Sequence, residues 1–483
     1  MNSLTQNFQL ISGDMTITAA IEKLRLGEIS SVQLVNACLE RAEQGKELNI
    51  FVTIDQENAL KAAQEVDDLI ARGEPLKPLS GIPIVVKDNI HTAGLRTTAG
   101  SPAFAHFYPE NDAPTVAKLR EAGAIIIGKT NMHELAFGAT GYNKAFNTGE
   151  LTGVRNPYDS NRIAGGSSSG SAAALGARMA FAALGTDTGG SMRIPPALNG
   201  CASLRPSAGR YSLKGLIPIA ESRDTVGPMA LSMEDLKLID SLITDDFENP
   251  EIQISELRLG LPEEFWCNLD EDTAELTKNA IEQLKAQGIT FVEIKNSQLL
   301  ELNQPVGFSV VIYEAYDCMV NYLKEYDHQM TIEELSEKIS SPDVKTIYEE
   351  WILPRKIPTA DGLVDVEPLY HAAQNGGRDL LRQQYEQIFN EYQIDALIFP
   401  TTAIVAPLAN DEIYKPENFD KLIQNTEASA SVGLPSIQLP VGLGTTTGLP
   451  VGIELDAPKD TDRRLLAIGQ LIESILGRLP SPQ

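Results

Sequence analysis

The sequence predicts an α/β fold in which helices cover a β-sheet. Short apolar runs typical of buried strands occur at residues 81–86, 124–127, 396–400 and 437–451. A segment with apolar side chains at helical spacing, residues 115–122, separates the first two runs. This alternation favours helices layered on a sheet. Because the late strands could rejoin the first sheet, we expect a single domain over residues 1–483 rather than two.

The N-terminal part, residues 1–75, is expected to be a helical segment. Residues 17–42 carry apolar side chains at helical spacing, and residues 57–71 repeat the pattern with acidic residues between the apolar ones. Such patterns are typical of amphipathic helices that keep one face in water.

The middle of the chain has a different character. Residues 148–227 are rich in Gly, Ser and Pro and contain few charges, and an alanine-rich run at residues 171–183 predicts a helix among them. Glycine lets the backbone approach other groups closely, so this stretch suits a site built from main chain. Residues 272–392 are instead predicted to form mostly charged amphipathic helices.

Composition excludes several classes of protein. The chain has 483 residues, 42% of them hydrophobic, and a formal net charge of −27. That charge repels phosphate backbones and anionic lipid, so neither a nucleic-acid nor a membrane partner is expected. No apolar run approaches the roughly 20 residues that span a bilayer, and the first residues lack the pattern of a secretion signal. We therefore expect a cytoplasmic protein. The four cysteines lie far apart, which indicates buried free thiols rather than disulfides or a zinc site: Cys38, Cys201, Cys267 and Cys318.

Two familiar motifs occur in the wrong context. Residues 123–130, GAIIIGKT, satisfy the letter of a phosphate-binding loop around Lys129, but three isoleucines mark the segment as a strand. Residues 166–170, GSSSG, match the nucleophile elbow with Ser168 at its centre. An elbow follows a hydrophobic strand, whereas a polar, turn-rich stretch precedes Ser168. Neither motif is therefore interpreted as functional.

A third motif is incomplete. His133 and Glu134 begin the zinc-binding pattern H-E-x-x-H, but Phe137 stands where the second histidine is needed. We expect no metal site and no cofactor.

Glycine and serine cluster twice, at residues 165–170 and 185–193, on either side of the alanine-rich run. Each cluster alone is typical of an ordinary loop. Together with Lys87 at the end of an apolar strand, they resemble the glycine- and serine-rich region of the amidase signature family. Further matches extend the resemblance over nearly the whole chain: residues 81–89, 129–132, 156–157, 227–228, 433–435 and 449–452. The resemblance implies a large mixed central β-sheet with helices on both faces.

The resemblance also implies a catalytic triad of Lys87, Ser167 and Ser191, with 24 positions between the two serines. A serine hydroxyl needs a base to become a nucleophile, and a lysine can be that base only if burial leaves it uncharged. In the family, the lysine takes a proton from the serine at 167, which follows a cis peptide bond. That serine in turn takes a proton from the nucleophile, here Ser191.

Other site residues follow from the same match. The backbone N–H groups of four consecutive residues are expected to form the oxyanion hole: Thr188, Gly189, Gly190 and Ser191. Supporting roles are expected for Ser168, Asp187 and Arg193, with Asp88 as a further group that could hydrogen-bond within the site. The substrate pocket is expected to include Phe137, Gly138 and Gly166.

Within the family, residues 131–138, 209–211, 218–219, 223–225, 450–456 and 462–469 resemble the branch of indoleacetamide and mandelamide hydrolases. This implies hydrolysis of a small arylacetamide to a carboxylic acid and ammonia, with the helical insertion at about 272–392 roofing the pocket. A homodimer is left open. Three alternatives stay open: the glutaminase subunit of a tRNA-dependent amidotransferase, a hydrolase of biuret or urea-like amides, and a binding protein that retained the fold without activity. The intact triad favours an enzyme.

Overall fold

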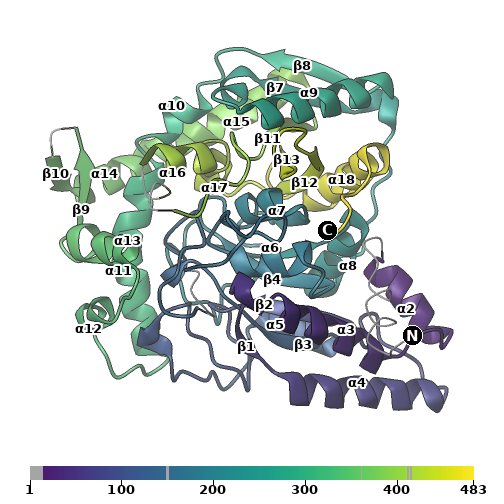
Figure 1. Ribbon diagram of the computed structural model, residues 1–483. Coiled ribbons are helices and arrows are strands. Elements are labelled where there is room, and N and C mark those ends of the chain that lie inside the picture. The colour runs from purple at the N-terminus through teal and green to yellow at the C-terminus, as the bar shows by residue number, and fades with distance from the viewer. Residues whose placement is uncertain (1–14, 148–151, 361, 411–412, 414–415, 483) are drawn as a thin grey trace.

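The fold is organised around one large β-sheet. The computed structural model describes residues 15–147, 152–360, 362–410, 413 and 416–482. Over these residues, eleven strands join in one sheet (Figure 1). Their spatial order is β1 (Phe51–Ile54), β3 (Ile125–Thr130), β2 (Pro83–Lys87), β4 (Ala182–Asp187), β6 (Thr225–Ala230), β5 (Ala202–Arg205), β12 (Ser436–Leu443), β13 (Pro450–Asp456), β11 (Ala396–Pro400), β7 (Arg258–Pro262) and β8 (Thr290–Ile294).

The sheet is mixed, as the family resemblance implies. Strand β2 runs parallel to both β3 and β4, and β7 runs parallel to both β11 and β8. The pairs between these two groups, from β4–β6 to β13–β11, are antiparallel, and so is the edge pair β1–β3. Because β2 and β4 are adjacent and parallel, Lys87 and Asp187 leave the sheet at the same edge. Ligand sites in α/β proteins commonly lie beyond such carboxyl ends.

Helices cover both faces of the sheet. The alternation along β11 shows this, because Ala396 and Ile398 join one apolar cluster and Leu397 and Phe399 join another. The helices α8 (Met233–Thr244), α9 (Glu271–Ala286) and α18 (Asp462–Leu476) pack on the first face. The helices α10 (Leu299–Asn303), α15 (Arg378–Tyr392) and α17 (Glu427–Val432) pack on the second.

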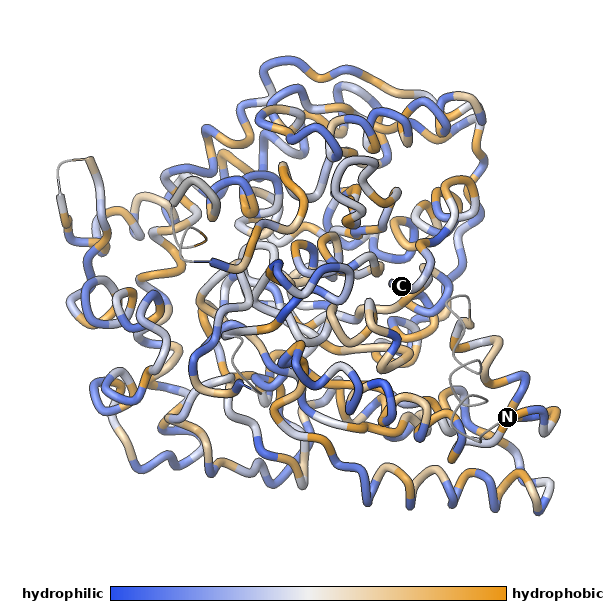
Figure 2. Tube along the Cα trace, in the orientation of Figure 1, coloured by the Kyte–Doolittle hydropathy of each residue, from blue (hydrophilic) through white to orange (hydrophobic). Residues whose placement is uncertain are grey.

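The N-terminal helices are amphipathic, as predicted, but they are not continuous. The predicted helix over residues 17–42 is two helices, α2 (Ile17–Arg25) and α3 (Ser31–Gln44). Gly27, with a φ of 67°, interrupts the helical backbone between them. Ser30 is the N-cap of α3 and forms a capping box with Gln33. Helix α4 (Gln56–Ala71) alternates in hydropathy along its length (Figure 2). Strand β1 lies between α3 and α4, so the part of residues 1–75 that the structure describes is not wholly helical.

The alanine-rich helix is shorter than predicted. Helix α6 spans Ser169–Gly176, and strand β4 begins at Ala182. The sequence AAL at residues 182–184 was expected to be largely helical, but it pairs with Ile84 and Val86 of the neighbouring strand β2. Tertiary pairing has overridden the helical propensity of alanine.

The range 272–392 is also less uniform than predicted, because α9, β8 and α15 belong to the sheet and its covering helices. The part that stands beside the sheet is residues 307–360 and 362–377, which we call the lateral segment (Figure 1). It contains α11 (Gly307–Glu325), α12 (Ile332–Glu337), α13 (Pro342–Thr346), the π-helical η6 (Ile347–Ile352), the hairpin β9 (Lys356–Thr359) and β10 (Gly362–Asp365), α14 (Val366–Ala372) and the π-helical η7 (Ala373–Gly377).

An apolar cluster attaches the lateral segment to the rest of the molecule. From the sheet side it includes Phe104, Met132 and Phe137, and from the lateral segment it includes Met319 and Tyr348.

The remaining helices are α5 (Pro114–Glu121), α7 (Ile194–Asn199) and α16 (Pro416–Ile423), and the short 3₁₀ turns are η1 (Lys46–Leu48), η2 (Pro102–Phe104), η3 (Glu134–Ala136), η4 (Ile254–Glu256) and η5 (Glu263–Trp266). A search of the described residues found no helix that is both long and apolar enough to cross a bilayer.

Close backbone contact at Gly170 packs α6 against the residue before β1 and the residue after β3. A Cβ atom at this position would lie 2.5 Å from the carbonyl oxygens of both Ile50 and Asn131. We therefore expect Gly170→Ala to lower the free energy of unfolding by about 3 kcal/mol, the upper end of the usual cost of overpacking, because backbone neighbours cannot rotate away. Urea denaturation measures the loss.

Gly73→Ala is the matched control for that variant. Gly73 has a φ of 68°, and a Cβ atom there would meet nothing within 4 Å. Its replacement should cost about 1 kcal/mol, from the left-handed backbone alone. Equal losses for the two variants would show that the close contact at Gly170 contributes nothing.

Candidate active site

A buried lysine lies at the centre of the candidate site. Lys87 is the last residue of β2 and is fully buried. Its Nζ atom lies 2.8 Å from Ser167 Oγ and 2.7 Å from Thr186 Oγ1, so it is in hydrogen-bond contact with both hydroxyl groups. The structure therefore brings together two of the three residues predicted for the triad.

The surroundings of Lys87 favour an uncharged amine. Burial lowers its pKa to about 7, although the negative charges of Asp187 and Asp224 oppose this shift. The groups that touch the amine are hydroxyls and not carboxylates, so nothing in direct contact stabilises the ammonium form strongly. Near neutral pH, a large fraction of Lys87 can therefore accept a proton.

Ser167 is held by its backbone on both sides. The peptide bond between Gly166 and Ser167 is cis, as the family resemblance implies. The Gly166 N–H donates to the Ala139 carbonyl at 2.7 Å, and the Ser167 carbonyl accepts from the His133 N–H at 3.1 Å. These contacts fix the hydroxyl of Ser167 beside Lys87.

Ser168 is not free to act as a nucleophile. Its hydroxyl donates to the Thr186 carbonyl at 3.0 Å and accepts from the Thr186 N–H at 3.2 Å. This pair of bonds joins the start of α6 to β4. Ser168 thus links the loop of Ser167 to the strand that leads to the second loop.

The three predicted pocket residues lie together beside Ser167. A Cβ atom at Gly166 would lie 2.7 Å from the carbonyl oxygen of Gly138, so these two glycines are in close backbone contact. Phe137 is 8% exposed, and its ring meets that of Tyr348 edge to face with centroids 5.6 Å apart. One residue of the lateral segment thus packs against this part of the site.

The second glycine-serine loop, residues 187–193, folds around the carboxylate of Asp187. Asp187 Oδ1 accepts from the Gly190 N–H and Oδ2 accepts from the Met192 N–H, both at 2.9 Å. Burial alone would raise the pKa of Asp187, but the guanidinium groups of Arg193 and Arg205 outweigh it and hold the pKa well below its ordinary value. The carboxylate is therefore charged and braces the loop.

The backbone donors of this loop are not equivalent. Gly190, one of the four residues predicted for the oxyanion hole, already gives its N–H to Asp187. The N–H groups of Thr188, Gly189 and Ser191 have no acceptor within the described part of the chain. Three of the four predicted donors therefore remain available to a ligand.

Ser191 is the most accessible of the three predicted triad residues. It is partly exposed, whereas Lys87 and Ser167 are buried. Its hydroxyl has no hydrogen-bond partner among the residues that the structure describes. The bond from Ser191 to Ser167 that the resemblance implies is therefore not formed in this arrangement of the side chains.

Buried ion pairs extend from Asp187 into the sheet. Arg193 Nε lies 3.1 Å from Asp187 Oδ2, and Arg193 Nη1 lies 2.6 Å from Glu454 Oε1 on β13. Arg205 Nη1, at the end of β5, lies 2.5 Å from Asp187 Oδ1. Removing one partner from such a pair leaves an uncompensated buried charge, which is costly. The structure thus places Asp187 and Arg193, the two residues predicted to support the loop, in one buried ion pair.

Several residues of the site were missed by sequence reasoning. Thr186 contacts Lys87, and Asn89 Nδ2 donates to Thr186 Oγ1 at 3.1 Å. The Thr188 hydroxyl donates to Asp224, which lies directly before β6. Thr186 stands beside Asp187 at the end of a strand, which was a usable signal. Asn89 lies within the matched residues 81–89 and Asp224 within the matched residues 223–225, but a match to the family does not show which side chains these residues contact.

Lys129 and His133, which belong to two of the three rejected motifs, make structural contacts. Lys129 lies within β3, and its buried amine donates to the Ile90 carbonyl at 2.8 Å and to Thr97 Oγ1 at 2.9 Å. It also lies 3.5 Å from Asp88 Oδ1, so Asp88 faces Lys129 and not the triad. His133 Nε2 lies 3.0 Å from Oδ2 of Asp343, in the lateral segment.

The cysteines differ in their exposure. Cys267 is exposed, contrary to the expectation of four buried thiols, and Cys318 is partly exposed. Among the described residues, no group of three His, Cys, Asp or Glu side chains is placed to hold a metal ion.

Comparison with known proteins agrees with this geometry. The Amidase family model matches residues 33–466. The mandelamide hydrolase of Pseudomonas putida is 44% identical over 97% of this chain and 93% of its own length. The indoleacetamide hydrolase of Rhizobium radiobacter is 35% identical over 96% of this chain and 97% of its own length.

Solved structures give the same result. The native peptide amidase from Stenotrophomonas maltophilia superimposes with a TM-score of 0.80 at 27% identity, over 97% of this chain and 98% of its own. A structure described as an amidase superimposes with a TM-score of 0.82 at 30% identity, over 96% of this chain and all of its own. The predicted fold class and family resemblance are confirmed. The chain therefore belongs to the amidase family and is an amidohydrolase that acts on C–N bonds.

Proposed function

We propose that the chain hydrolyses a small primary arylacetamide, of the kind represented by mandelamide or indole-3-acetamide, to the carboxylic acid and ammonia. The contact between a buried amine and a serine hydroxyl, Lys87 with Ser167, carries the proposal for the chemistry. The 44% identity to a mandelamide hydrolase over nearly the whole chain supports the choice of substrate.

The proposed reaction begins with two proton transfers. Uncharged Lys87 takes the proton of Ser167 Oγ, and Ser167 takes the proton of Ser191 Oγ as that oxygen attacks the amide carbon. For this, the Ser191 side chain must rotate to donate to Ser167 when substrate binds. Catalytic hydrogen bonds often tighten only in the complex.

The tetrahedral intermediate carries a negative charge on the former carbonyl oxygen. In the proposal, this oxygen accepts hydrogen bonds from the N–H groups of Thr188, Gly189 and Ser191, which have no other acceptor in the described chain. Removing one such donor typically costs about 2.7–4 kcal/mol of transition-state stabilisation. Because Asp187 fixes the loop before substrate arrives, the donors need little reorganisation.

Collapse of the intermediate breaks the C–N bond. Ser167 returns a proton to the departing nitrogen, so ammonia leaves and an ester to Ser191 remains. Lys87 then gives its extra proton back to Ser167. Water attacks the acyl-enzyme and gives a proton to the same Ser167–Lys87 pair. The ester bond to Ser191 breaks, that proton passes to Ser191 Oγ, and the carboxylic acid is released. Each proton taken from a nucleophile is thus returned to a leaving group, and the enzyme ends unchanged.

The proposal places the aryl group beside Phe137, Gly138 and Gly166. The rings of Phe137 and Tyr348 form an apolar contact that an aryl group could extend. Gly138 and Gly166 are required by packing within the protein, because a Cβ atom would meet the His133 ring at Gly138 and the Gly138 carbonyl at Gly166. We propose that the lateral segment forms the roof of this pocket within one domain, since Tyr348 belongs to it. All three triad residues come from one chain, so a second copy is not required for the chemistry.

Release of ammonia tests the substrate class. The purified chain should release ammonia from mandelamide, indole-3-acetamide and phenylacetamide, but should release little from glutamine, biuret or urea. Ser191→Ala should abolish both turnover and covalent labelling by a fluorophosphonate, because the attacking oxygen is removed. Ser168→Ala is the control for labelling, since this hydroxyl is bonded to Thr186.

Two outcomes would contradict this part of the proposal. Preferential hydrolysis of glutamine would point to the amidotransferase subunit, and preferential hydrolysis of biuret would point to urea-like amides. Labelling that persists in Ser191→Ala but disappears in Ser168→Ala would show that Ser168, and not Ser191, is the nucleophile.

The charge of Lys87 sets the expected pH dependence. Because its pKa is lowered to about 7 and the base must be uncharged, kcat/KM should rise as the pH increases through about 7. Lys87→Met should lower kcat/KM by about 10²–10⁴-fold, the usual contribution of a general base, and the remaining activity should lose this rise.

Lys129→Met supplies the matched control, because Lys129 is equally buried but lies on the neighbouring strand β3. Its residual activity should keep the rise through about pH 7. A pH profile that is the same in the wild type and in Lys87→Met would rule out Lys87 as the base.

A further inference from the structure

Side chains from outside the loop hold three successive carbonyl groups of the second glycine-serine loop. Arg205 Nη1 donates to the Asp187 carbonyl at 3.0 Å, Arg223 Nε donates to the Thr188 carbonyl at 3.0 Å, and Thr426 Oγ1 donates to the Gly189 carbonyl at 2.7 Å. All three donors come from distant parts of the chain. The direction of these three peptide groups is therefore set in part from outside the loop.

The direction of a carbonyl group determines that of the next N–H. In a trans peptide the C=O and the following N–H point to opposite sides, and the cis bond recorded in the described chain is Gly166–Ser167, outside this loop. The bond from Arg223 to the Thr188 carbonyl therefore turns the Gly189 N–H away from Arg223. That N–H has no acceptor within the described residues.

We propose that Arg223 is a positioning residue that aims the Gly189 N–H at the oxyanion of the reaction intermediate. The inference rests on the proposed function, because it assumes that Ser191 is the nucleophile and that this N–H is a donor. Arg223 acts through the Thr188 carbonyl and need not touch the substrate. Of the two arginines that hold carbonyls in this loop, Arg205 also pairs with the Asp187 carboxylate. Within the described residues, Arg223 forms no hydrogen bond or ion pair with the Asp187 carboxylate or with Lys87, Ser167 or Ser191.

The other contacts of Arg223 fix it to the lateral segment. Its Nη1 donates to the carbonyl of Gly307 at 2.5 Å, at the start of α11, and its Nη2 lies 3.4 Å from Glu427 Oε1 on α17. A Cβ atom at Gly307 would lie 2.5 Å from the Glu427 carboxylate, so the start of α11 is packed directly against this pair. Arg223 is 1% exposed, and its guanidinium is thus held in one orientation between the oxyanion loop and α11.

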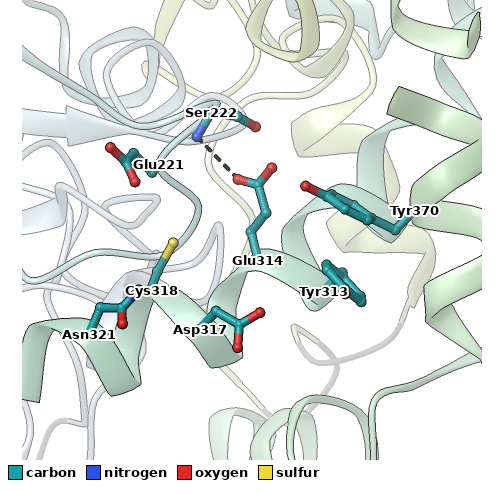
Figure 3. A pocket seen from close by; sticks show the side chains of 8 residues that line it. All are labelled: Glu221, Ser222, Tyr313, Glu314, Asp317, Cys318, Asn321 and Tyr370. Atoms are coloured by element: carbon teal, nitrogen blue, oxygen red, sulfur yellow. Dashed lines mark hydrogen bonds between the residues drawn. The ribbon is translucent and has the colours of Figure 1, made fainter. Parts of the chain in front are cut away.

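The residue before Arg223 is anchored separately. The Ser222 N–H donates to Glu314 Oε2 of α11 at 3.1 Å, at the wall of a cavity of about 430 Å³ (Figure 3). Arg378 donates to the Ser222 hydroxyl at 2.9 Å and to the Ser222 carbonyl at 3.0 Å. Arg378 therefore holds the same segment as Arg223 without touching the oxyanion loop, which makes it a matched control.

The test compares Arg223→Met and Arg223→Lys with Arg378→Met in the full chain. A misdirected donor weakens only the transition state, so Arg223→Met should lower kcat for arylacetamide by about 10²-fold and leave KM within about twofold. Arg223→Lys keeps the charge and one donor but not the planar fork, so its loss should be smaller. Arg378→Met should stay within about threefold of the wild type in both constants.

The rate of labelling by a fluorophosphonate is the second measurement. Labelling also places negative charge on an oxygen in the oxyanion hole, and it does not depend on which amide is the substrate. Arg223→Met should lower the second-order labelling rate at least about tenfold, and Arg378→Met should not.

An unchanged labelling rate in Arg223→Met would overturn the inference, and so would equal losses in Arg223→Met and Arg378→Met. Should Arg223→Met fail to fold, a labelling rate for folded Arg223→Lys equal to that of the wild type would overturn it as well. A wild-type chain that is labelled on Ser191 but hydrolyses no arylacetamide would refute the proposed substrate, while the labelling comparison would still decide the role of Arg223.

Discussion

The site depends on a buried amine, because burial lowers the pKa of Lys87 and favours its uncharged form. Lys87 ends a strand that is flanked by two others, and its contacts are the hydroxyls of Ser167 and Thr186. The nearby carboxylate of Asp187 would favour the ammonium form, but Arg193 and Arg205 pair with it directly. Two guanidinium groups around one carboxylate leave little negative charge to stabilise a proton on Lys87. The ion pairs that hold the second glycine-serine loop therefore also help to keep Lys87 uncharged, as its proposed role requires.

Lys129 shows how much the immediate neighbours matter. It lies on the adjacent strand β3 and is as deeply buried as Lys87, yet it faces the Asp88 carboxylate and the Ile90 carbonyl. Burial lowers its pKa only to about 8, because Asp88 opposes the shift. Two lysines of similar burial thus differ in their contacts. Lys129 contacts a carboxylate and a carbonyl, whereas Lys87 contacts two hydroxyls, as the proposed role of Lys87 as a base requires.

Much of this arrangement could be predicted from local sequence. The short apolar runs located β2, β3 and β11, and the two glycine-serine clusters located the loops that carry Ser167 and Ser191. The contacts that were missed join residues that are separated in the sequence. Arg205, Arg223 and Thr426 each donate to a carbonyl of the second glycine-serine loop from another part of the chain. A carbonyl group is present at every residue, so sequence alone does not reveal which one an arginine will hold. Pairing with β2 likewise decided that residues 182–184 form a strand rather than the end of a helix.

The ionisation of Lys87 can be observed directly by NMR. In protein labelled with ¹³C at lysine Cε, the Lys87 signal is assigned by its loss in Lys87→Met, and the Lys129 signal by its loss in Lys129→Met. The account predicts that the Lys87 signal titrates with a midpoint near pH 7. A midpoint near the ordinary lysine value of about 10.4 would mean that Lys87 is charged at neutral pH, and would contradict its role as the base.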